Sequence, residues 1–396
     1  MPEWNTVRVG DYATQRTDKV KIDRRVEYIT MGVRWYGRGA YLRPPSKPHA
    51  AALTPARAGD LVFCRIDTQK GPFAVVPDEF DGSLVTNEFP LYVVAPDVFD
   101  TRYLSLSFGR PSVLAAIGAD REGNDGRARW KAAEFEDWQV PCPPLPEQRR
   151  IAALVDSVGQ AIDALEAEAD ALLAVLRLRR AELITGVDAD PVRADKAFDI
   201  LLGRQRSPER ATGPSMTHYL RSANVGYDEL RMDDVLSMDF NEKERVRYQL
   251  LDGDVLVSEG SASPTAVGMP AVWHDELEGP VCFQNTLLRY RAINGVTTPA
   301  FVRQWCLWAF ESGEFRETAG DAPGVRHIGA KKASAMLVRL PHLNQQTEIT
   351  DVLNPMADAV AALRAEALHL LDLRSAVLEA LLAGEVDLLG STVEEA

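Results

Sequence analysis

The stretch Pro143-Pro144-Leu145-Pro146-Glu147-Gln148-Arg149-Arg150-Ile151 stands immediately before a long helical pattern. A second copy occurs 198 positions later as Pro341-His342-Leu343-Asn344-Gln345-Gln346-Thr347-Glu348-Ile349. It keeps the first proline, the leucine, the glutamine (Gln148 in the first copy, Gln346 in the second) and the isoleucine in place. A repeat at about half the chain length predicts that the protein is built from two related halves.

Apolar residues recur after each motif in alternating steps of four and three, which is the period of a coiled-coil seam. Arg179 and Arg374 are the polar residues that interrupt this pattern. The prolines before each segment predict its start, and Gly186 and Gly384 predict left-handed caps at the two ends. The seam residues are Ile151, Val155, Val158, Ile162, Leu165, Leu172, Leu176, Ile349, Leu353, Val360, Leu363, Leu370, Val377 and Leu381.

Each helical segment contains a residue that favours a break. Asn354-Pro355 predicts a kink or break in the second helix, and Gly159 lies near the equivalent place in the first. An unbroken helix from Glu147 to Thr185 would be roughly 58 Å long at about 1.5 Å per residue. We expect the two helices to pair with each other in antiparallel orientation.

The region ahead of each helix is rich in β-branched and aromatic residues and is punctuated by glycine and proline, which is typical of a mixed α/β domain. A strand is expected at each of the matching stretches 59–64 and 253–258, and a second sequence match joins 85–92 to 282–288. The predicted fold class is α+β, with a pseudo-twofold internal repeat. Residues 1–143 and 187–340 form the two domains, 144–186 and 341–390 form the helical spacers, and 391–396 form a tail.

Composition excludes several classes of protein. The 396 residues are 46% hydrophobic and 26% charged, which argues against disorder, and no apolar run is long enough for a membrane span. Residues 1–10 do not have the pattern of a secretory signal, so a cytoplasmic location is expected. Cys64, Cys142, Cys282 and Cys306 are widely spaced, and neither disulfides nor a zinc site are expected.

The net charge of −14 argues at first against nucleic-acid binding, but the charge is unevenly distributed. Residues 341–396 contain ten acidic and two basic residues. Residues 19–57 contain nine basic residues against Asp23 and Glu27, so this stretch could face an anion.

Catalytic motifs are absent. The sequence has no phosphate-binding G-x-x-x-x-G-K-[ST] loop, no H-E-x-x-H pair and no dinucleotide fingerprint. Asn354-Pro355 is not followed by the aromatic residue that amino-methyltransferases place there, and the stretch 260–264 does not match a nucleophile elbow. We therefore predict no catalytic residues, no metal site and no cofactor in this chain.

Two copies of a P-P-L-x-E-Q-x-x-I motif, each opening a long heptad helix after a globular domain, resemble the specificity subunit of type I restriction-modification systems. The resemblance covers nearly the whole chain, and residues 219–225 resemble a common opening of the second recognition domain. It implies two target recognition domains at opposite ends of an antiparallel helical pair. Each domain would read one half of a bipartite double-stranded DNA sequence, and the helices would fix the spacer.

The resemblance also implies the partners. Two methyltransferase subunits would dock on the chain, bind S-adenosylmethionine and methylate adenine N6, and restriction subunits would join a complex that cleaves DNA. The chain itself would be a non-catalytic subunit of a phage-defence system.

Candidate DNA contacts follow from side-chain chemistry, because arginine can bond guanine or phosphate and asparagine can bond adenine. For the loop around Arg34 the alternative is a solvated basic loop with one buried tryptophan, and for Asn224 it is a turn in which the side chain bonds its own backbone. The candidates in the first domain are Lys19, Lys21, Arg24, Arg25, Arg34, Trp35, Tyr36 and Arg38. The candidates in the second domain are Arg221, Ser222, Asn224, Tyr227, Lys243, Arg245, Arg247, Lys331 and Lys332.

Three other functions stay open at the level of the sequence. The chain could be an enzyme whose site has no linear motif, or a coiled-coil scaffold that binds proteins and has no DNA specificity. It could also be a similar subunit of another phage-defence system.

Overall fold

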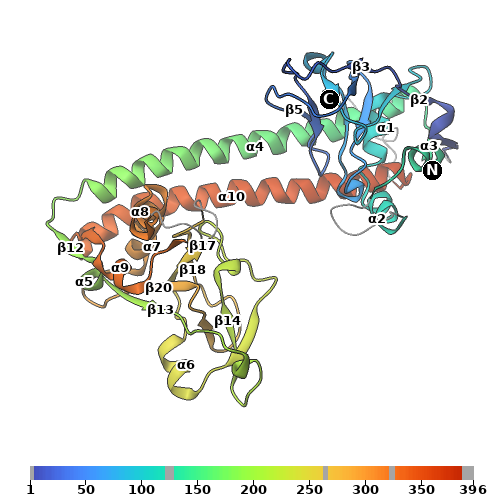
Figure 1. The fold of residues 1–396 in the computed structure, drawn as a ribbon. Helices are drawn as coiled ribbons and strands as arrows, with labels where there is room; N and C mark the ends of the chain where they lie inside the picture. The colour runs from blue at the N-terminus through green and yellow to red at the C-terminus, as the bar shows by residue number, and fades with distance from the viewer. Residues whose placement is uncertain (1–3, 121–128, 262–265, 321–325, 386–396) are drawn as a thin grey trace, which may run out of the picture. The chain divides into compact units, whose positions relative to one another are not determined.

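The computed structural model describes residues 4–120, 129–261, 266–320 and 326–385. The chain divides into two compact units. Unit 1 contains residues 1–166 and 365–396, and unit 2 contains residues 167–364. Because the division falls inside both long helices, α4 (Leu145–Thr185) and α10 (Leu343–Leu382), each unit contains a part of each helix (Figure 1).

The elements of unit 1 that precede α4 are β1 (Thr6–Arg8), β2 (Ala13–Gln15), β3 (Val20–Lys21), β4 (Met31–Val33), β5 (Ala40–Leu42), β6 (Ala52–Pro55), β7 (Leu61–Phe63), β8 (Phe73–Val75), β9 (Leu84–Val85), β10 (Leu91–Val94), α1 (Thr101–Ser107), α2 (Pro111–Asp120), α3 (Ala132–Asp137) and β11 (Gln139–Pro141). Within the described residues its largest sheet is antiparallel, in the order β2-β10-β7-β8. Phe63, Phe73 and Trp130 pack beside this sheet in one aromatic cluster.

The elements of unit 2 between the two long helices are β12 (Pro191–Arg193), α5 (Ala194–Ala197), β13 (Phe198–Leu202), β14 (Met216–Leu220), β15 (Leu236–Asp239), α6 (Glu242–Tyr248), β16 (Val255–Ser258), β17 (Gly260–Ser261), β18 (Pro270–Val272), β19 (Val281–Phe283), β20 (Leu287–Ala292), α7 (Pro299–Glu311), α8 (Glu314–Ala319), β21 (Arg326–His327), α9 (Ala330–Ala335) and β22 (Leu337–Arg339). Its largest described sheet is antiparallel, in the order β13-β20-β16-β18. This order matches unit 1 strand for strand, so the predicted repeat is present in the fold.

The strands expected at 59–64 and 253–258 are confirmed as β7 and β16. Each begins after a glycine with positive φ, 81° at Gly59 and 83° at Gly253, and then a buried aspartate. Asp60 accepts two guanidinium hydrogen bonds from Arg16, which follows β2, whereas Asp254 accepts two from Arg291 on β20.

The long helices run antiparallel in both units. In unit 1, Ile151 and Val155 near the start of α4 share a core with Leu378 and Leu381 near the end of α10. In unit 2, Leu176 near the end of α4 shares a core with residues near the start of α10, namely Ile349, Leu353, Ala357 and Val360. The predicted α+β class, with two long antiparallel helices, is confirmed.

A buried glutamine anchors the start of each long helix. Gln148 is 0% exposed, and its Nε2 donates to the carbonyls of Val98 at 2.9 Å and Pro143 at 2.8 Å. Its Oε1 accepts from the backbone N–H of Asp100 at 2.8 Å. Because Asp100 is also the N-cap of α1, one side chain fixes the turn before α4 to the start of α1.

The second copy repeats this arrangement bond for bond. Gln346 is also 0% exposed, and its Nε2 donates to Val296 at 2.8 Å and Pro341 at 2.9 Å. Its Oε1 accepts from the N–H of Thr298, the N-cap of α7, at 2.9 Å. The glutamine that both copies of the sequence motif keep is therefore a structural clamp.

Of the kink or break predicted at Asn354-Pro355, the break is wrong, because α10 continues through these residues as a helix. Proline has no N–H to bond the carbonyl one turn earlier in the helix. Because Pro355 lies on the exposed side of α10, water can bond that carbonyl instead. Asn354 stays in the helix and accepts a hydrogen bond from Gln304 of α7 at 2.8 Å. Likewise α4 continues through Gly159.

The predicted left-handed cap is confirmed at Gly384, whose φ is 71°, and wrong at Gly186. At Gly186 the N–H donates to the Glu182 carbonyl at 2.8 Å, so α4 ends on an ordinary helical hydrogen bond.

The seam positions are all buried or half-buried, but the register in unit 2 departs from a strict heptad. The arginine that is buried in α4 is Arg180, at 1% exposure, and Arg179 is exposed. Leu173 is likewise more buried than Leu172. A straight α-helix drifts against a 3.5-residue repeat, and α4 here also packs against a globular domain, so the buried stripe advances by one residue.

We predict that Gln346→Ala lowers the free energy of unfolding by about 2–3 kcal/mol, because it leaves three backbone groups without their partner. Gln345→Ala is the matched control, since Gln345 is the exposed neighbour on the same turn. Urea denaturation of both variants measures the difference. Equal stability of the two variants would contradict the clamp.

Candidate nucleic-acid interface

The basic stretch of unit 1 divides into exposed residues and residues held by other parts of the unit. Lys19, Lys21, Arg24 and Arg25 lie on or beside β3 and are exposed. Lys19 donates to Asn87 at 2.5 Å, and Arg25 pairs with its neighbour Asp23. These side chains remain at the surface and could reach phosphate oxygens.

The hairpin loop between β4 and β5 is held by contacts within unit 1. Arg34 lies over the Tyr41 ring at 4.9 Å, and Lys70 lies 3.9 Å from the centre of the Trp35 ring. Trp35 is 46% exposed, so the alternative of a buried tryptophan in this loop is wrong.

Two residues of this loop point toward the long helices. Arg38 Nη2 donates to Glu166 of α4 at 2.9 Å, and Tyr36 lines a groove against α10. This ion pair engages the Arg38 guanidinium within unit 1, but its side chain is 52% exposed, so Arg38 stays a predicted DNA contact.

In unit 2 the structure contradicts Asn224 as a base-reading residue. Asn224 is 2% exposed, and its Nδ2 donates to the carbonyls of Arg231 at 2.9 Å and Asp234 at 3.0 Å. Its Oδ1 accepts from the N–H of Arg221 at 3.0 Å. These three hydrogen bonds all serve the local turn, which is the alternative given above for Asn224.

Arg221, Ser222 and Tyr227 are also held by contacts within unit 2. Arg221 pairs with Asp234, and the Ser222 N–H donates to Thr286 Oγ1 at 3.1 Å. The Tyr227 hydroxyl donates to Glu311 of α7, so Tyr227 belongs to a buried network beside α4 and is corrected as a DNA candidate.

That network surrounds Arg180. Its Nε donates to Gln304 at 2.8 Å and its Nη1 pairs with Glu311. Arg177 lies over the Tyr227 ring at 5.1 Å. Burial, together with the negative charge of Glu311, raises the pKa of Tyr227, so the hydroxyl stays a donor. The network fixes the second domain to α4 inside unit 2.

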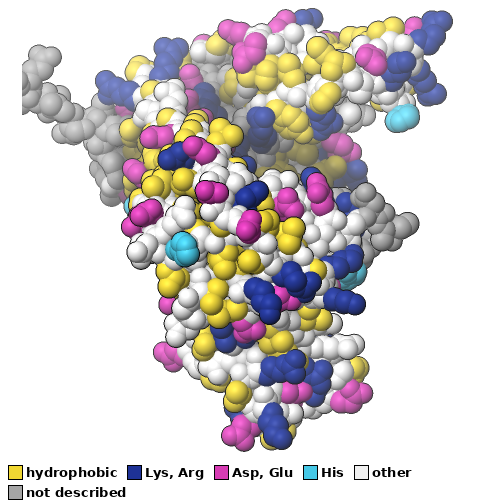
Figure 2. All heavy atoms as spheres, turned by 90° about the vertical axis from the view of Figure 1, so that its left-hand side faces the viewer, with side chains coloured by type: hydrophobic (Ala, Val, Ile, Leu, Met, Phe, Trp, Pro, Cys, Tyr) yellow, Lys and Arg dark blue, Asp and Glu magenta, His cyan; other side chains and the backbone are white. Residues whose placement is uncertain are grey.

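The predicted basic residues of α6 are more accessible. Lys243 and Arg247 are exposed, and Arg245 is half-buried. Lys and Arg side chains recur over the lower part of the face in Figure 2, at the height of β14 and α6 in Figure 1. On α9, Lys331 is exposed, and Lys332 donates to the Ala319 carbonyl at 3.2 Å.

Two arginines that sequence reasoning did not select hold α6 in place. Arg204 Nε and Arg210 Nη1 donate to the two carboxylate oxygens of Glu244 at 2.8 and 2.7 Å. Burial by itself raises the pKa of Glu244, but these hydrogen bonds outweigh burial and lower that pKa below its usual value. The loop between them, which carries the exposed Arg206, therefore lies against α6. No local signal identifies this set, because its members are up to forty positions apart.

Within the described ranges there is no metal site, disulfide or membrane-spanning helix. They contain no group of three or more His, Cys, Asp or Glu that could hold a metal ion. The four cysteines all lie in these ranges and are free thiols. In the same ranges no helix is both long and apolar enough to cross a bilayer.

The architecture is that of a two-fold repeated α/β protein built on a pair of long helices. No protein-family model matches the sequence. A 235-residue alignment is 22% identical to the EcoKI type I restriction enzyme specificity subunit of Escherichia coli K12, and it covers 55% of this chain and 50% of that protein. The aligned region thus spans about half the length of this curated relative.

Two solved structures share the fold over nearly the whole chain. One, reported for complex assembly and conformational transition of the type I R-M system, has a TM-score of 0.59 at 18% identity and covers 98% of this chain and 99% of that one. The type I S subunit from M. genitalium has a TM-score of 0.52 at 11% identity, with 96% of each chain covered. The chain therefore has the fold of type I specificity subunits, and the resemblance seen in the sequence is confirmed.

We predict that Asn224→Ala lowers the free energy of unfolding by roughly 2–4 kcal/mol, because two carbonyls and one N–H in a buried turn lose their partner. Thermal and urea denaturation measure this, with the exposed Ala223→Ser as the control on the same turn. A variant as stable as the parent chain would show that the side chain is free for another role.

Proposed function

We propose that this chain is the DNA specificity subunit of a type I restriction-modification complex. The observation that carries the proposal is the repetition of one framework with two different surfaces. The same order of the main sheet and the same glutamine clamp occur in both units, but α6 has no helical counterpart among the described residues of unit 1. The second sheet also differs, because β3-β6-β9 of unit 1 is antiparallel throughout whereas β14 and β19 of unit 2 pair in parallel. Two equivalent supports with different surfaces suit the reading of two different half-sites.

Contacts to DNA are proposed on the exposed basic residues of each unit. In unit 2 these are Arg206, Lys243 and Arg247, on α6 and the loop against it. In unit 1 they are the exposed residues at β3, namely Lys19, Lys21, Arg24 and Arg25. Phosphate contacts of this kind supply affinity and orientation, and base reading needs further contacts in the groove.

The long helices are proposed to set the spacer between the half-sites and to bind two methyltransferase subunits. Exposed apolar side chains on these helices support the docking, since Leu178 is 75%, Leu368 63% and Val175 54% exposed. The docked subunits would bind S-adenosylmethionine and methylate adenine N6. Restriction subunits would complete a complex that cleaves DNA, in the cytoplasm where its target lies.

The proposal is tested by co-expressing the chain with the methyltransferase encoded beside it and mapping adenine methylation by single-molecule sequencing. A split motif with a fixed spacer is expected, and it should vanish when this chain is omitted. Methylation that does not depend on the chain would instead favour a protein-binding scaffold.

We predict that Lys243→Ala with Arg247→Ala lowers DNA affinity and reduces the slope of log K against log salt by about two, since each lost phosphate contact changes it by about 0.9. Fluorescence anisotropy of the assembled complex at several salt concentrations measures the slope. Arg193→Ala with Lys196→Ala removes the same charge from another exposed part of unit 2 and is expected to leave the slope unchanged. An equal effect of both pairs would contradict the α6 surface.

We also predict that one added heptad in each long helix, after Glu166 and after Arg364, lengthens the spacer. Seven residues add about 10.5 Å of helix, or about three base pairs. The insertion points are the unit boundaries, so each core stays intact. The methylated motif reports the spacer directly, and an unchanged spacer would show that the helices do not set it.

A further inference from the structure

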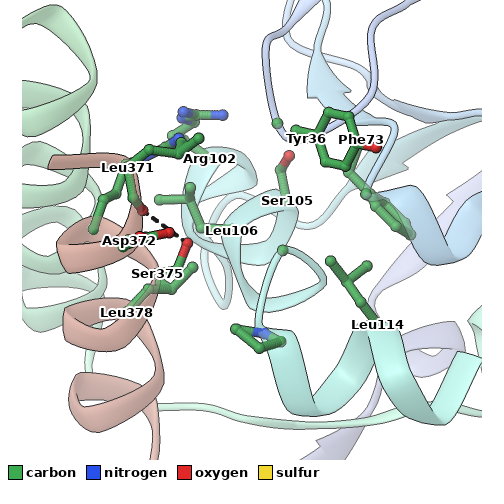
Figure 3. Close-up of a pocket in the computed structure, with 15 residues that line it drawn as sticks. Tyr36, Phe73, Arg102, Ser105, Leu106, Leu114, Leu371, Asp372, Ser375 and Leu378 are labelled. Carbon is green, nitrogen blue, oxygen red and sulfur yellow. Dashed lines mark hydrogen bonds between the residues drawn. The ribbon is translucent and has the colours of Figure 1, made fainter. Parts of the chain in front are cut away.

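A groove in unit 1 is lined by residues that the proposed DNA role does not use. Two adjoining cavities of about 260 and 410 Å³ share Tyr36, Arg102, Leu371 and Arg374. Figure 3 shows the first cavity, with Tyr36 and Phe73 on one side and Leu371 and Ser375 of α10 on the other. All these residues belong to one compact unit.

Arg374 is a half-buried cation that has no hydrogen-bonded partner among the described residues. Its Nε is inaccessible to solvent and makes no hydrogen bond, and no carboxylate in the described ranges forms an ion pair with it. Its neighbour Arg102, in contrast, binds Asp156 at 2.6 Å. Burial and the positive charge of Arg102 lower the pKa of Arg374, and the negative charges of Asp156 and Asp163, which line the second cavity, oppose this. Asp372 lines the first cavity and Asp156, Asp163 and Glu166 line the second, but none of them forms an ion pair with Arg374. A guanidinium withdrawn from water without a paired counter-ion is costly, so an anion placed against Arg374 is favoured.

Tyr36 at the groove is held in an unusual backbone conformation. Its φ is 61°, in the left-handed region that a bulky side chain rarely adopts. The Tyr36 N–H donates to the backbone carbonyl of Lys70 at 2.7 Å and the Gly37 N–H to that of Gly71 at 3.0 Å, which keeps this conformation in place. The side chain is nevertheless 59% exposed. Strain that is maintained at an exposed aromatic residue is characteristic of ligand sites.

We propose that this groove binds a small ligand that carries a carboxylate or phosphate group on an apolar or aromatic body. Arg374 contacts the anion, with the remaining guanidinium N–H groups of Arg102 close by. Phe73 and Leu114 on one side, and Leu371 and Leu378 on the other, contact the body of the ligand. The site is separate from the proposed DNA contacts and does not depend on them.

Calorimetric titration of the full-length chain, in complex with methyltransferase where the chain requires it, tests the proposal. The probes are phenyl phosphate and benzoate, with inorganic phosphate as an anion lacking a body and benzyl alcohol as a body lacking the anion. Phenyl phosphate or benzoate is expected to bind with a Kd of about 1 mM or tighter, and the stronger of the two identifies the anion. Inorganic phosphate and benzyl alcohol are expected to bind at least tenfold more weakly.

The Arg374→Met variant keeps the volume of the side chain and removes its charge, and it is expected to weaken binding at least tenfold. Its Tm is expected to equal or exceed that of the parent, because the lost charge has no partner. Arg364→Met is the control, since Arg364 lies on the same helix but pairs with Asp170 at 3.3 Å. It is expected to leave binding unchanged.

Tyr36→Gly provides a second variant that relieves the backbone strain. It is expected to fold and to reduce the affinity for phenyl phosphate or benzoate several-fold. The proposal is overturned if no anionic probe binds at about 10 mM, or if Arg374→Met binds as the parent does. It is also overturned if Arg374→Met weakens DNA binding while all the small probes fail to bind, because the arginine then serves the nucleic acid.

Discussion

The buried glutamine at the start of each long helix is the interaction on which the rest of the structure depends. Gln148 and Gln346 each bond two carbonyls and one N–H that lie on different segments of the chain. A buried backbone group without a partner costs about 1–3 kcal/mol, so a side chain that satisfies three of them strongly fixes the geometry around it. Helix and domain are thereby joined in one unit, and the direction in which each long helix leaves its domain is set by hydrogen bonds.

The repeat preserves this framework while the surface changes. Asp60 and Asp254 occupy matching turns, yet the arginine that binds Asp60 follows β2 and the one that binds Asp254 lies on β20. In both units an arginine thus neutralises the buried aspartate that follows the glycine. That arginine comes from a different part of the sheet in each unit. Surface elements such as α6 have no such requirement, which is the physical reason that two related domains can carry different binding faces.

Two arginines interrupt the apolar seam, and their surroundings differ. Arg180 is enclosed by Gln304, Glu311 and Tyr227, so its charge is balanced and it helps to hold α7 against α4. Arg374 has no such partner in the described structure. Arg180 is therefore a structural contact, whereas Arg374 leaves a cation available at the groove in unit 1.

The sequence by itself determined the repeat, the two long helices and the strands after Gly59 and Gly253, because heptad spacing, proline and glycine act over a few neighbouring residues. It did not determine which polar side chains are free. Asn224 and Arg38 look like DNA contacts in sequence, but their partners are supplied by the fold, and Glu166 is 128 positions away from Arg38. Burial of Arg180 in place of Arg179 was likewise decided by packing against α7. Tertiary structure assigns such partners because a hydrogen bond depends on distance in space, and chain spacing does not fix that distance beyond a single helix or turn.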